Sequence, residues 1–306
     1  MPFTAKSGKF NASINTVEFG TGDKAVKIGG ENVFPLYSFD AAIENAPKVG
    51  IEITDFGMEH EPECIKKYYE GCATLADMAR KAASMEGVDF LSFRMEGGDP
   101  NGANKSTEEL IGELKEIADA VDLPLVVCGC KNVEKDAELF SKAAEALNGK
   151  NAVILSAKEE NYKTVGAAAG LAYKQIVGAE SAVDINLAKQ LNVLISQLGV
   201  DSKSVVMNVG SAAVGYGFEY VISTMDRVKA AALQQGDANL QMPIITPVAS
   251  EAWGVKEAMA SETDAPEWGS QEERGIDMEV ETAMAVIAAG SNAVILKHPE
   301  SIKIIS

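Results

Sequence analysis

Two cysteines, Cys128 and Cys130, lie one residue apart in the segment PLVVCGCKNVEKDAELF, at the end of an apolar run. Such a pair suggests a metal site, an iron–sulfur cluster or a redox cycle. In a strand, residues i and i+2 point to the same face about 6.6 Å apart, which is close to the limit for a disulfide and wrong in direction. Cys64 and Cys72 lie in an earlier segment, and the sequence contains no CxxC motif. We therefore expect Cys128 and Cys130 to be small buried side chains without a metal.

Two lysines are candidates for covalent chemistry. Lys158 and Lys297 each follow an apolar run, a position in which Schiff-base enzymes hold a nucleophilic lysine. Both have charged or polar neighbours, and Lys158 precedes Glu159 and Glu160. Because such neighbours keep an amine hydrated, we expect solvated lysines.

Metal binding by other side chains has weak support. Two histidines in the chain, His60 and His298, are too few for a histidine-rich zinc site. Carboxylates could hold Mg²⁺, but strand alternation would direct some of them toward the helices. The acidic candidates are Glu52, Glu96, Asp99 and Glu180.

Two glycine-rich segments, 93–104 (FRMEGGDPNGAN) and 208–220 (NVGSAAVGYGFEY), offer sites for a ligand or a partner. Glycine allows close approach of the backbone and presents amide groups to a ligand. A plain loop remains the alternative for both. The candidate cofactor-binding residues are Asn101, Asn208, Gly210, Ser211, Gly215 and Tyr216.

Eight apolar or β-branched runs alternate with amphipathic segments and must position these residues. The helical segment 106–121 shows the pattern, because Leu110, Leu114 and Ile117 recur at helical spacing and Ser106 with Glu109 resembles a capping box. This alternation predicts parallel strands, and the absence of GxGxxG favours a closed (β/α)8 TIM barrel of the α/β class over an open sheet. The predicted strands are 48–56, 88–96, 123–130, 151–157, 174–180, 204–210, 241–248 and 292–298.

The two ends of the chain depart from the repeat. Residues 16–30 predict a β-hairpin that covers one barrel end, so we divide the chain into an N-terminal extension, 1–47, and a barrel, 48–306. The seventh loop is long, from Ser250 to a helix predicted at 279–290. The chain ends eight residues after His298, which predicts a shortened last helix.

Composition excludes several classes of protein. The net charge is −18, with 45 acidic and 27 basic residues, which argues against nucleic-acid binding. The chain contains neither a long apolar run nor a signal-like N-terminus, and its four cysteines do not make a disulfide framework. We expect a cytoplasmic protein with no membrane partner.

Several segments together resemble one family. They are MEGGDPNGANKS, PLVVCGCKNVEKD, ENYKT, DINLAKQLN, GYGFEYVISTMDR, PVASEAW and WGSQEERG. The chain resembles the small (delta) subunit of the corrinoid iron–sulfur protein of the acetyl-CoA decarbonylase/synthase system. The likeness extends from the predicted hairpin to KHPE near the C-terminus.

The resemblance implies a barrel subunit of a heterodimer that carries methyl groups on the cobalt of a corrinoid (cobamide). The methyl group would come from methyltetrahydrofolate through a methyltetrahydrofolate:corrinoid methyltransferase and go to acetyl-CoA synthase, in the reductive acetyl-CoA pathway. The large subunit would hold the iron–sulfur cluster and most of the corrinoid. This chain would cap the corrinoid at the subunit interface, with no iron–sulfur cluster and no catalytic residue of its own.

The residues agree with this distribution of the cofactors between the two subunits. Neither His60 nor His298 lies in the DxHxxG pattern of a corrinoid domain that replaces the lower base with histidine. The glycine-rich loops would lie over the macrocycle, and Asn208, Ser211 and Tyr216 would contact its amide side chains.

Two enzyme functions remain as alternatives. A pterin-dependent methyltransferase barrel would need amide and carboxylate side chains that converge on the pterin, and Asp55, Asn101 and Asn208 could supply them. A Schiff-base lyase would use Lys158.

Overall fold

The computed structural model describes residues 8–306, so residues 1–7 of the predicted extension lie outside the described residues. Eight parallel strands form one sheet in the order β8-β7-β6-β5-β4-β3-β10-β9. All eight predicted strands are present, and each is shorter than expected because residues at one or both ends belong to loops. The strands are β3 (Lys48–Thr54), β4 (Phe90–Arg94), β5 (Leu125–Cys128), β6 (Val153–Ala157), β7 (Ile176–Glu180), β8 (Val205–Asn208), β9 (Ile245–Pro247) and β10 (Ala293–Leu296).

The sheet closes into a barrel at the seam between β8 and β9. Met207 and Ile244 form a parallel bridge there, and the Met207 amide donates to the Pro243 carbonyl at 2.8 Å. The predicted (β/α)8 barrel is thus confirmed.

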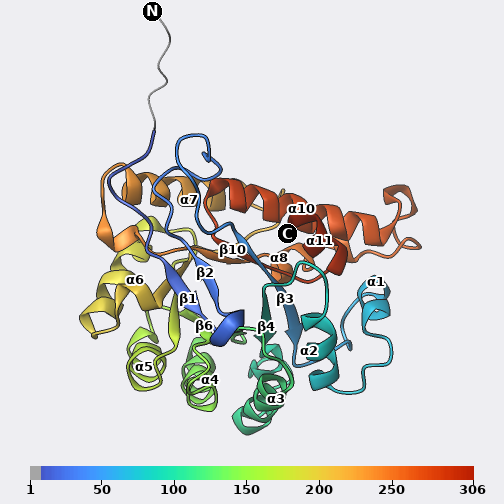
Figure 1. The fold of residues 1–306 in the computed structure, drawn as a ribbon. Coiled ribbons are helices and arrows are strands. Elements are labelled where there is room, and N and C mark those ends of the chain that lie inside the picture. Colours follow the sequence, from blue (N-terminus) through green and yellow to red (C-terminus); the bar gives the residue numbers. More distant parts are fainter. Residues whose placement is uncertain (1–7) are drawn as a thin grey trace, which may run out of the picture.

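The predicted hairpin is also present and fills the amino-terminal end of the barrel. Strands β1 (Val17–Phe19) and β2 (Val26–Ile28) pair antiparallel and lie in the middle of the ring of helices in Figure 1. Their buried side chains belong to one apolar cluster with the barrel interior, where Phe19 meets Phe90 edge to face at 5.5 Å. The hairpin therefore closes the barrel end opposite the strand ends where barrel sites form.

Helices cover the outside of the barrel (Figure 1), and four of the longer ones begin at side-chain caps that the sequence encodes. Ser106, Asn132, Asp184 and Ser270 each accept a hydrogen bond from a backbone amide in the first helical turn. The helices are α1 (Glu63–Lys66), α2 (Leu75–Ala83), α3 (Thr107–Ala120), α4 (Val133–Ala146), α5 (Tyr162–Val165), α6 (Ile185–Gln197), α7 (Phe218–Leu233), α8 (Ala249–Ala252), α9 (Lys256–Met259), α10 (Gln271–Ala289) and α11 (Pro299–Ile305).

The C-terminal region corrects one prediction and confirms another. Helix α10 begins at Gln271, not at residue 279, because Ser270 caps it and its first turns dock on the long loop through hydrogen bonds from Arg274 to the carbonyls of Glu257 and Ala260. The last helix, α11, has seven residues and is short as predicted. In the described chain, no helix is both long and apolar enough to cross a bilayer.

Candidate functional site at the barrel mouth

Strand alternation directs a layer of polar side chains into the barrel at its carboxyl end. On β4, Phe90 packs in the interior cluster near the hairpin, so Ser92 and Arg94 point inward above it. Glu52 on β3 is level with Ser92, and Arg94 is level with Cys128 on β5. The mouth of the barrel is therefore polar although its lower interior is apolar.

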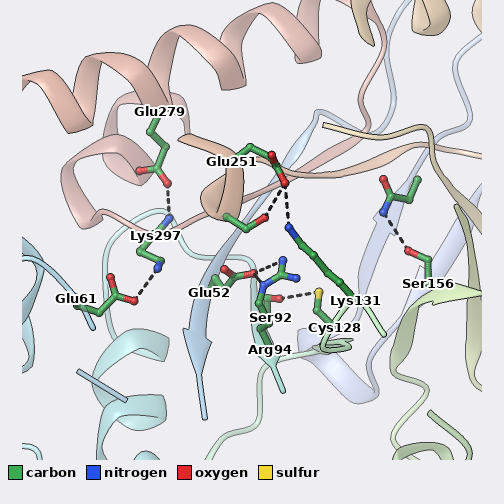
Figure 2. A network of polar contacts seen from close by, with 12 residues as sticks. Glu52, Glu61, Ser92, Arg94, Cys128, Lys131, Ser156, Glu251, Glu279 and Lys297 are labelled. Atoms are coloured by element: carbon green, nitrogen blue, oxygen red, sulfur yellow. Dashed lines mark hydrogen bonds and ion pairs between the residues drawn. The ribbon is translucent and has the colours of Figure 1, made fainter. Parts of the chain in front are cut away.

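Arg94 and Glu52 form a buried ion pair on the floor of this mouth (Figure 2). Nε and Nη2 of Arg94 donate to Oε2 of Glu52 at 3.0 and 2.8 Å. Their side chains are 9% and 1% exposed. Burial opposes the charge on Arg94, but the Glu52 carboxylate outweighs it and holds the pKa of the guanidinium above its usual range. The guanidinium of Arg94 is thus charged at neutral pH.

A second ion pair, between Lys131 and Glu251, spans the mouth above Arg94. Nζ of Lys131, from the loop after β5, lies 3.2 Å from Oε1 of Glu251 in α8 (Figure 2). Two cavities of about 300 and 380 Å³ border Lys131, Arg94, Gly129 and Ser250 in common. The first cavity extends toward β6, β7 and β8, and the second toward β3 and β10. The ion pair therefore divides one mouth into two chambers.

The two candidate lysines are both ion-paired. Lys158 lies 3.3 Å from Glu180, and Lys297 lies 2.6 Å from Glu61 with only 13% of its side chain exposed. The expectation of a solvated Lys297 is wrong, because the residue belongs to the inward face of β10 and enters the barrel mouth. Burial alone would lower the pKa of Lys297. The nearby carboxylates of Glu61 and Glu52 raise it by more than burial lowers it, so the pKa lies above the usual value. A protonated amine cannot attack a carbonyl group.

Cys128 and Cys130 are buried, as predicted, and all four cysteines are free thiols. The expectation that Cys128 and Cys130 share one face is wrong, because β5 ends at Cys128. Cys128 points into the barrel, 3.6 Å from Ser92 Oγ, whereas Cys130 joins the cluster between strands and helices. Asp136 causes the turn by accepting hydrogen bonds from the amide and the thiol of Cys130. Burial raises the pKa of the Cys128 thiol to about 11, so this thiol is neutral.

The acidic candidates do not assemble into a cation site. Glu52 pairs with Arg94, and Glu180 pairs with Lys158. In the part of the chain that the structure describes, no group of three or more His, Cys, Asp and Glu side chains is arranged to hold a metal ion.

The six candidate cofactor-binding residues fall into two groups. Asn208, Gly210 and Ser211 line the first chamber. Nδ2 of Asn208 donates to Ser156 Oγ at 3.0 Å, and Oδ1 accepts from the amide of Gly210, whose φ of 97° requires glycine.

The other three candidates lie outside both chambers. Gly215 and Tyr216 are exposed on the rim, where the Tyr216 hydroxyl donates to Glu257 at 2.6 Å. Asn101 is exposed, and its amide groups donate to Asp99. Asn132, in the loop after β5, accepts a hydrogen bond from the Lys135 amide and caps α4.

Sequence reasoning missed Ser156 and Glu61, which the structure adds to the mouth. Ser156 is the one polar residue inside the apolar run of β6, and this position could have identified it as a residue of the site. Glu61 lies in a loop with no regular pattern, so the sequence held no signal for its pairing with Lys297.

His298 is buried beside the mouth and caps α11. Its Nδ1 accepts a hydrogen bond from the Glu300 amide at 3.2 Å, so the proton of the neutral ring is on Nε2, 3.4 Å from Glu272. The ring stacks on Trp253 at 5.8 Å. Burial lowers the pKa of His298 from 6.5 to about 4, and protonation of Nδ1 would also remove the cap.

This lowered pKa predicts a pH-dependent contribution to stability. Between about pH 6.5 and 4 the unfolded chain binds a proton that folded His298 does not, so the free energy of unfolding falls as pH falls. A shift of this size corresponds to about 3 kcal/mol. His298→Asn keeps a capping oxygen but cannot titrate. We expect the stability difference between wild type and H298N to shrink by up to about 3 kcal/mol from pH 7 to pH 4, measured by urea unfolding. A constant difference would contradict the assignment.

Comparison with known sequences identifies relatives along nearly the whole chain. A family model described as CO dehydrogenase/acetyl-CoA synthase delta subunit matches residues 16–305. The acetyl-CoA decarbonylase/synthase complex subunit delta 1 of Methanosarcina thermophila is 30% identical over 293 residues, which cover 94% of this chain and 66% of that protein. Subunit delta of Methanothermobacter thermautotrophicus is 31% identical over 299 residues, which cover 97% and 75%. The chain thus spans about two thirds of the length of the first of these relatives.

Solved structures with the same fold include dihydropteroate synthases. The enzyme from Xanthomonas albilineans in complex with 7,8-dihydropteroate has a TM-score of 0.55 and 13% identity, and the match covers 85% of this chain and 91% of that chain. The enzyme from Thermus thermophilus in complex with 4-aminobenzoate has a TM-score of 0.53 and 12% identity, with coverage of 94% and 98%. At these identities the likeness shows the fold alone.

The resemblance inferred from the sequence motifs is therefore confirmed by the family match and by relatives that share the barrel region. The chain belongs to the CO dehydrogenase/acetyl-CoA synthase delta subunit family.

Proposed function

We propose that this chain is the non-catalytic barrel subunit of a heterodimeric corrinoid methyl carrier. It caps a corrinoid held by a large subunit and so assists methyl transfer from methyltetrahydrofolate, through a separate methyltransferase, to acetyl-CoA synthase. The bound corrinoid supplies the cobalt that carries the methyl group. The chain's own contribution is to cover the idle face of the cofactor and to exclude water from it.

The apolar rim of the barrel mouth is the observation that carries the proposal. Five exposed large apolar side chains lie in the segments that follow β7, β8 and β9, and two of them, Val183 and Met259, border the polar chambers. Exposed apolar side chains beside a polar site are typical of interaction surfaces. They are Val183, Tyr216, Tyr220, Met259 and Trp268, which are 37–66% exposed.

The volumes of the two chambers favour a cofactor that lies over the barrel mouth rather than one enclosed inside it. Volumes of about 300 and 380 Å³ lie at the lower end of the range for drug-sized ligands. A corrin macrocycle of linked pyrrole-derived rings is too large for either chamber, so it would lie across the mouth. Ser211 Oγ, buried without a hydrogen-bond partner in residues 8–306, offers a polar contact at that surface.

The charge pairing at the mouth supports a non-catalytic role. Arg94, Lys131, Lys158 and Lys297 each lie within 3.3 Å of a carboxylate oxygen. Paired and protonated cations are poor nucleophiles and poor general bases. A cap needs a fixed polar surface, and paired charges supply one.

The pterin-dependent methyltransferase remains the rival, since known structures of this fold bind pterin-derived ligands. Its three residues do not converge. Asp55 accepts hydrogen bonds from the Gly97 amide and pairs with Lys105 behind the mouth, whereas Asn101 is exposed and Asn208 lines the first chamber. Equilibrium dialysis of the purified chain with methyltetrahydrofolate separates the two functions, and micromolar binding would favour the methyltransferase.

Co-purification tests the proposed function directly. The isolated chain is expected to be colourless, and its complex with the large subunit is expected to show corrinoid and iron–sulfur absorption bands. Corrinoid bands from the isolated chain, or failure to form the complex, would overturn the proposal.

Tyr216 provides a test of the rim. Tyrosine is enriched among the interface residues whose truncation to alanine costs more than about 1 kcal/mol. We therefore expect Tyr216→Ala to speed corrinoid loss from the heterodimer at least about fivefold. Tyr37→Ala is a matched control, because Tyr37 is 46% exposed and Tyr216 is 48% exposed, but Tyr37 lies in the N-terminal extension. Equal rates of loss for the two variants would contradict a role of Tyr216 in capping.

A further inference from the structure

The first chamber contains hydrogen-bonding groups that the protein itself does not use. Ser211 Oγ is buried and has no partner within residues 8–306. Arg94 is 7% exposed and borders the same chamber, and it binds Glu52 through Nε and Nη2, so Nη1 takes part in neither bond. One hydroxyl and one guanidinium nitrogen thus remain available to a ligand.

The charge of the chamber lining limits what that ligand can be. Three cations border it, and so do three carboxylates. Two of the cations pair within the lining, Lys158 with Glu180 and Lys131 with Glu251. The third, Arg94, is neutralised by Glu52. The cations are Arg94, Lys131 and Lys158, and the carboxylates are Asp136, Glu180 and Glu251.

These pairs leave one carboxylate of the lining, Asp136, without a cation, and this disfavours an anion as the occupant. An ammonium group could not accept a hydrogen bond from Arg94 Nη1. A neutral group that both donates and accepts hydrogen bonds fits better. A primary carboxamide is such a group, because its oxygen can accept from Arg94 Nη1 and its NH₂ can donate to Ser211 Oγ.

We infer that the first chamber receives a carboxamide side chain from the edge of the corrin ring, with Ser211 and Arg94 as its partners. This inference rests on the proposed function, and it adds a side-chain receptor to the covering role. Corrinoids carry primary amides on flexible arms around the macrocycle. A chamber of about 300 Å³ beneath a ring that lies across the mouth has room for one arm. The contact would fix how the ring is rotated over the barrel.

The test uses the complex of this chain with the large subunit, loaded with cobinamide, which retains the amide arms. Corrinoid loss to an excess of a corrinoid-binding scavenger protein is followed by absorption. One lost hydrogen bond in a buried site corresponds to about a 2- to 13-fold change. Ser211→Ala is expected to speed the loss by that factor. Ser223→Ala, a serine on the outer face of α7, is the matched control and should leave the rate unchanged.

A second probe checks the chemistry of the arm. In wild-type complex, a corrinoid whose amides are hydrolysed to carboxylates should dissociate faster than cobinamide, and Ser211→Ala should narrow that difference. Equal rates of corrinoid loss from the wild-type and S211A complexes would overturn the proposed binding of a carboxamide arm. If the large subunit alone still loses corrinoid faster than either complex, the proposed covering role stands. If the complex loses cobinamide as fast as the large subunit alone, the proposed function itself fails.

Discussion

Replacing Lys229 with methionine is expected to lower the free energy of unfolding by about 3–5 kcal/mol, because it leaves a buried carboxylate without its partner. Nζ of Lys229, in α7, donates to Glu31 at 2.8 Å and to Asn292 at 3.0 Å. The lysine side chain is 1% exposed. Gly290 makes room for it, since a Cβ there would lie 2.6 Å from the lysine chain.

These contacts join three parts of the chain far apart in sequence. Glu31 follows the hairpin, and Asn292 precedes β10 and accepts from the Ile244 amide at the barrel seam. Burial alone would raise the pKa of Glu31, but Lys229 and Asn292 bring it below its usual value. The carboxylate is therefore charged, and it holds the N-terminal extension to the closed barrel.

Urea unfolding at pH 7 measures the effect. K229M combined with Glu31→Gln removes both charges and is expected to recover part of the loss, because the new amide oxygen can still accept from Asn292. Lys115→Met is the control on the exposed face of α3, with an expected change within about 0.5 kcal/mol. A K229M variant as stable as K115M would show that the buried pair does not stabilise the fold.

The second large effect concerns the ion pair on the floor of the mouth. Arg94→Met leaves Glu52 buried and unpaired, so we expect a loss of about 3–5 kcal/mol. Glu52→Gln alone leaves Arg94 unpaired and should cost a similar amount. The double variant should cost less than the sum of the two by about 2 kcal/mol, since neither charge remains.

Arg80→Met is the matched control, because Arg80 forms a pair of similar length with Asp77, 2.7 Å, on the surface of α2 with 54% of its side chain exposed. Exposed pairs are worth about 0.2–1 kcal/mol. Urea unfolding of the four variants gives the comparison. Additive losses in R94M and E52Q would mean that the two side chains do not act as a pair.

The fold was predictable because its signals are local and repeated. Each strand is an apolar run, and several of the longer helices begin at a polar cap such as Ser106 or Asn132. The start of α10 was missed because its first turns, which include Arg274, dock on the long loop by tertiary contacts. Strand ends were overestimated where polar or glycine residues continued an apolar run.

The site was predictable only where strand alternation decides it. Asn208 ends β8, Ser211 lies three residues later, and both line the mouth. The pairing of Lys131 with Glu251 joins residues 120 positions apart, and no sequence pattern connects them. The direction of the Cys130 side chain could not be predicted from the sequence either. It depends on a turn after β5, where the Cys130 amide donates a hydrogen bond to Asp136, six residues later.

The central claim is that this chain covers a corrinoid held by another subunit, and the rate of corrinoid loss tests it most directly. Absorption follows transfer of cobinamide to excess scavenger protein from the large subunit, with and without this chain. We expect corrinoid loss to be at least about tenfold slower from the complex, which corresponds to about 1.4 kcal/mol of added activation free energy. Equal rates with and without the chain, once complex formation is verified by gel filtration, would contradict it.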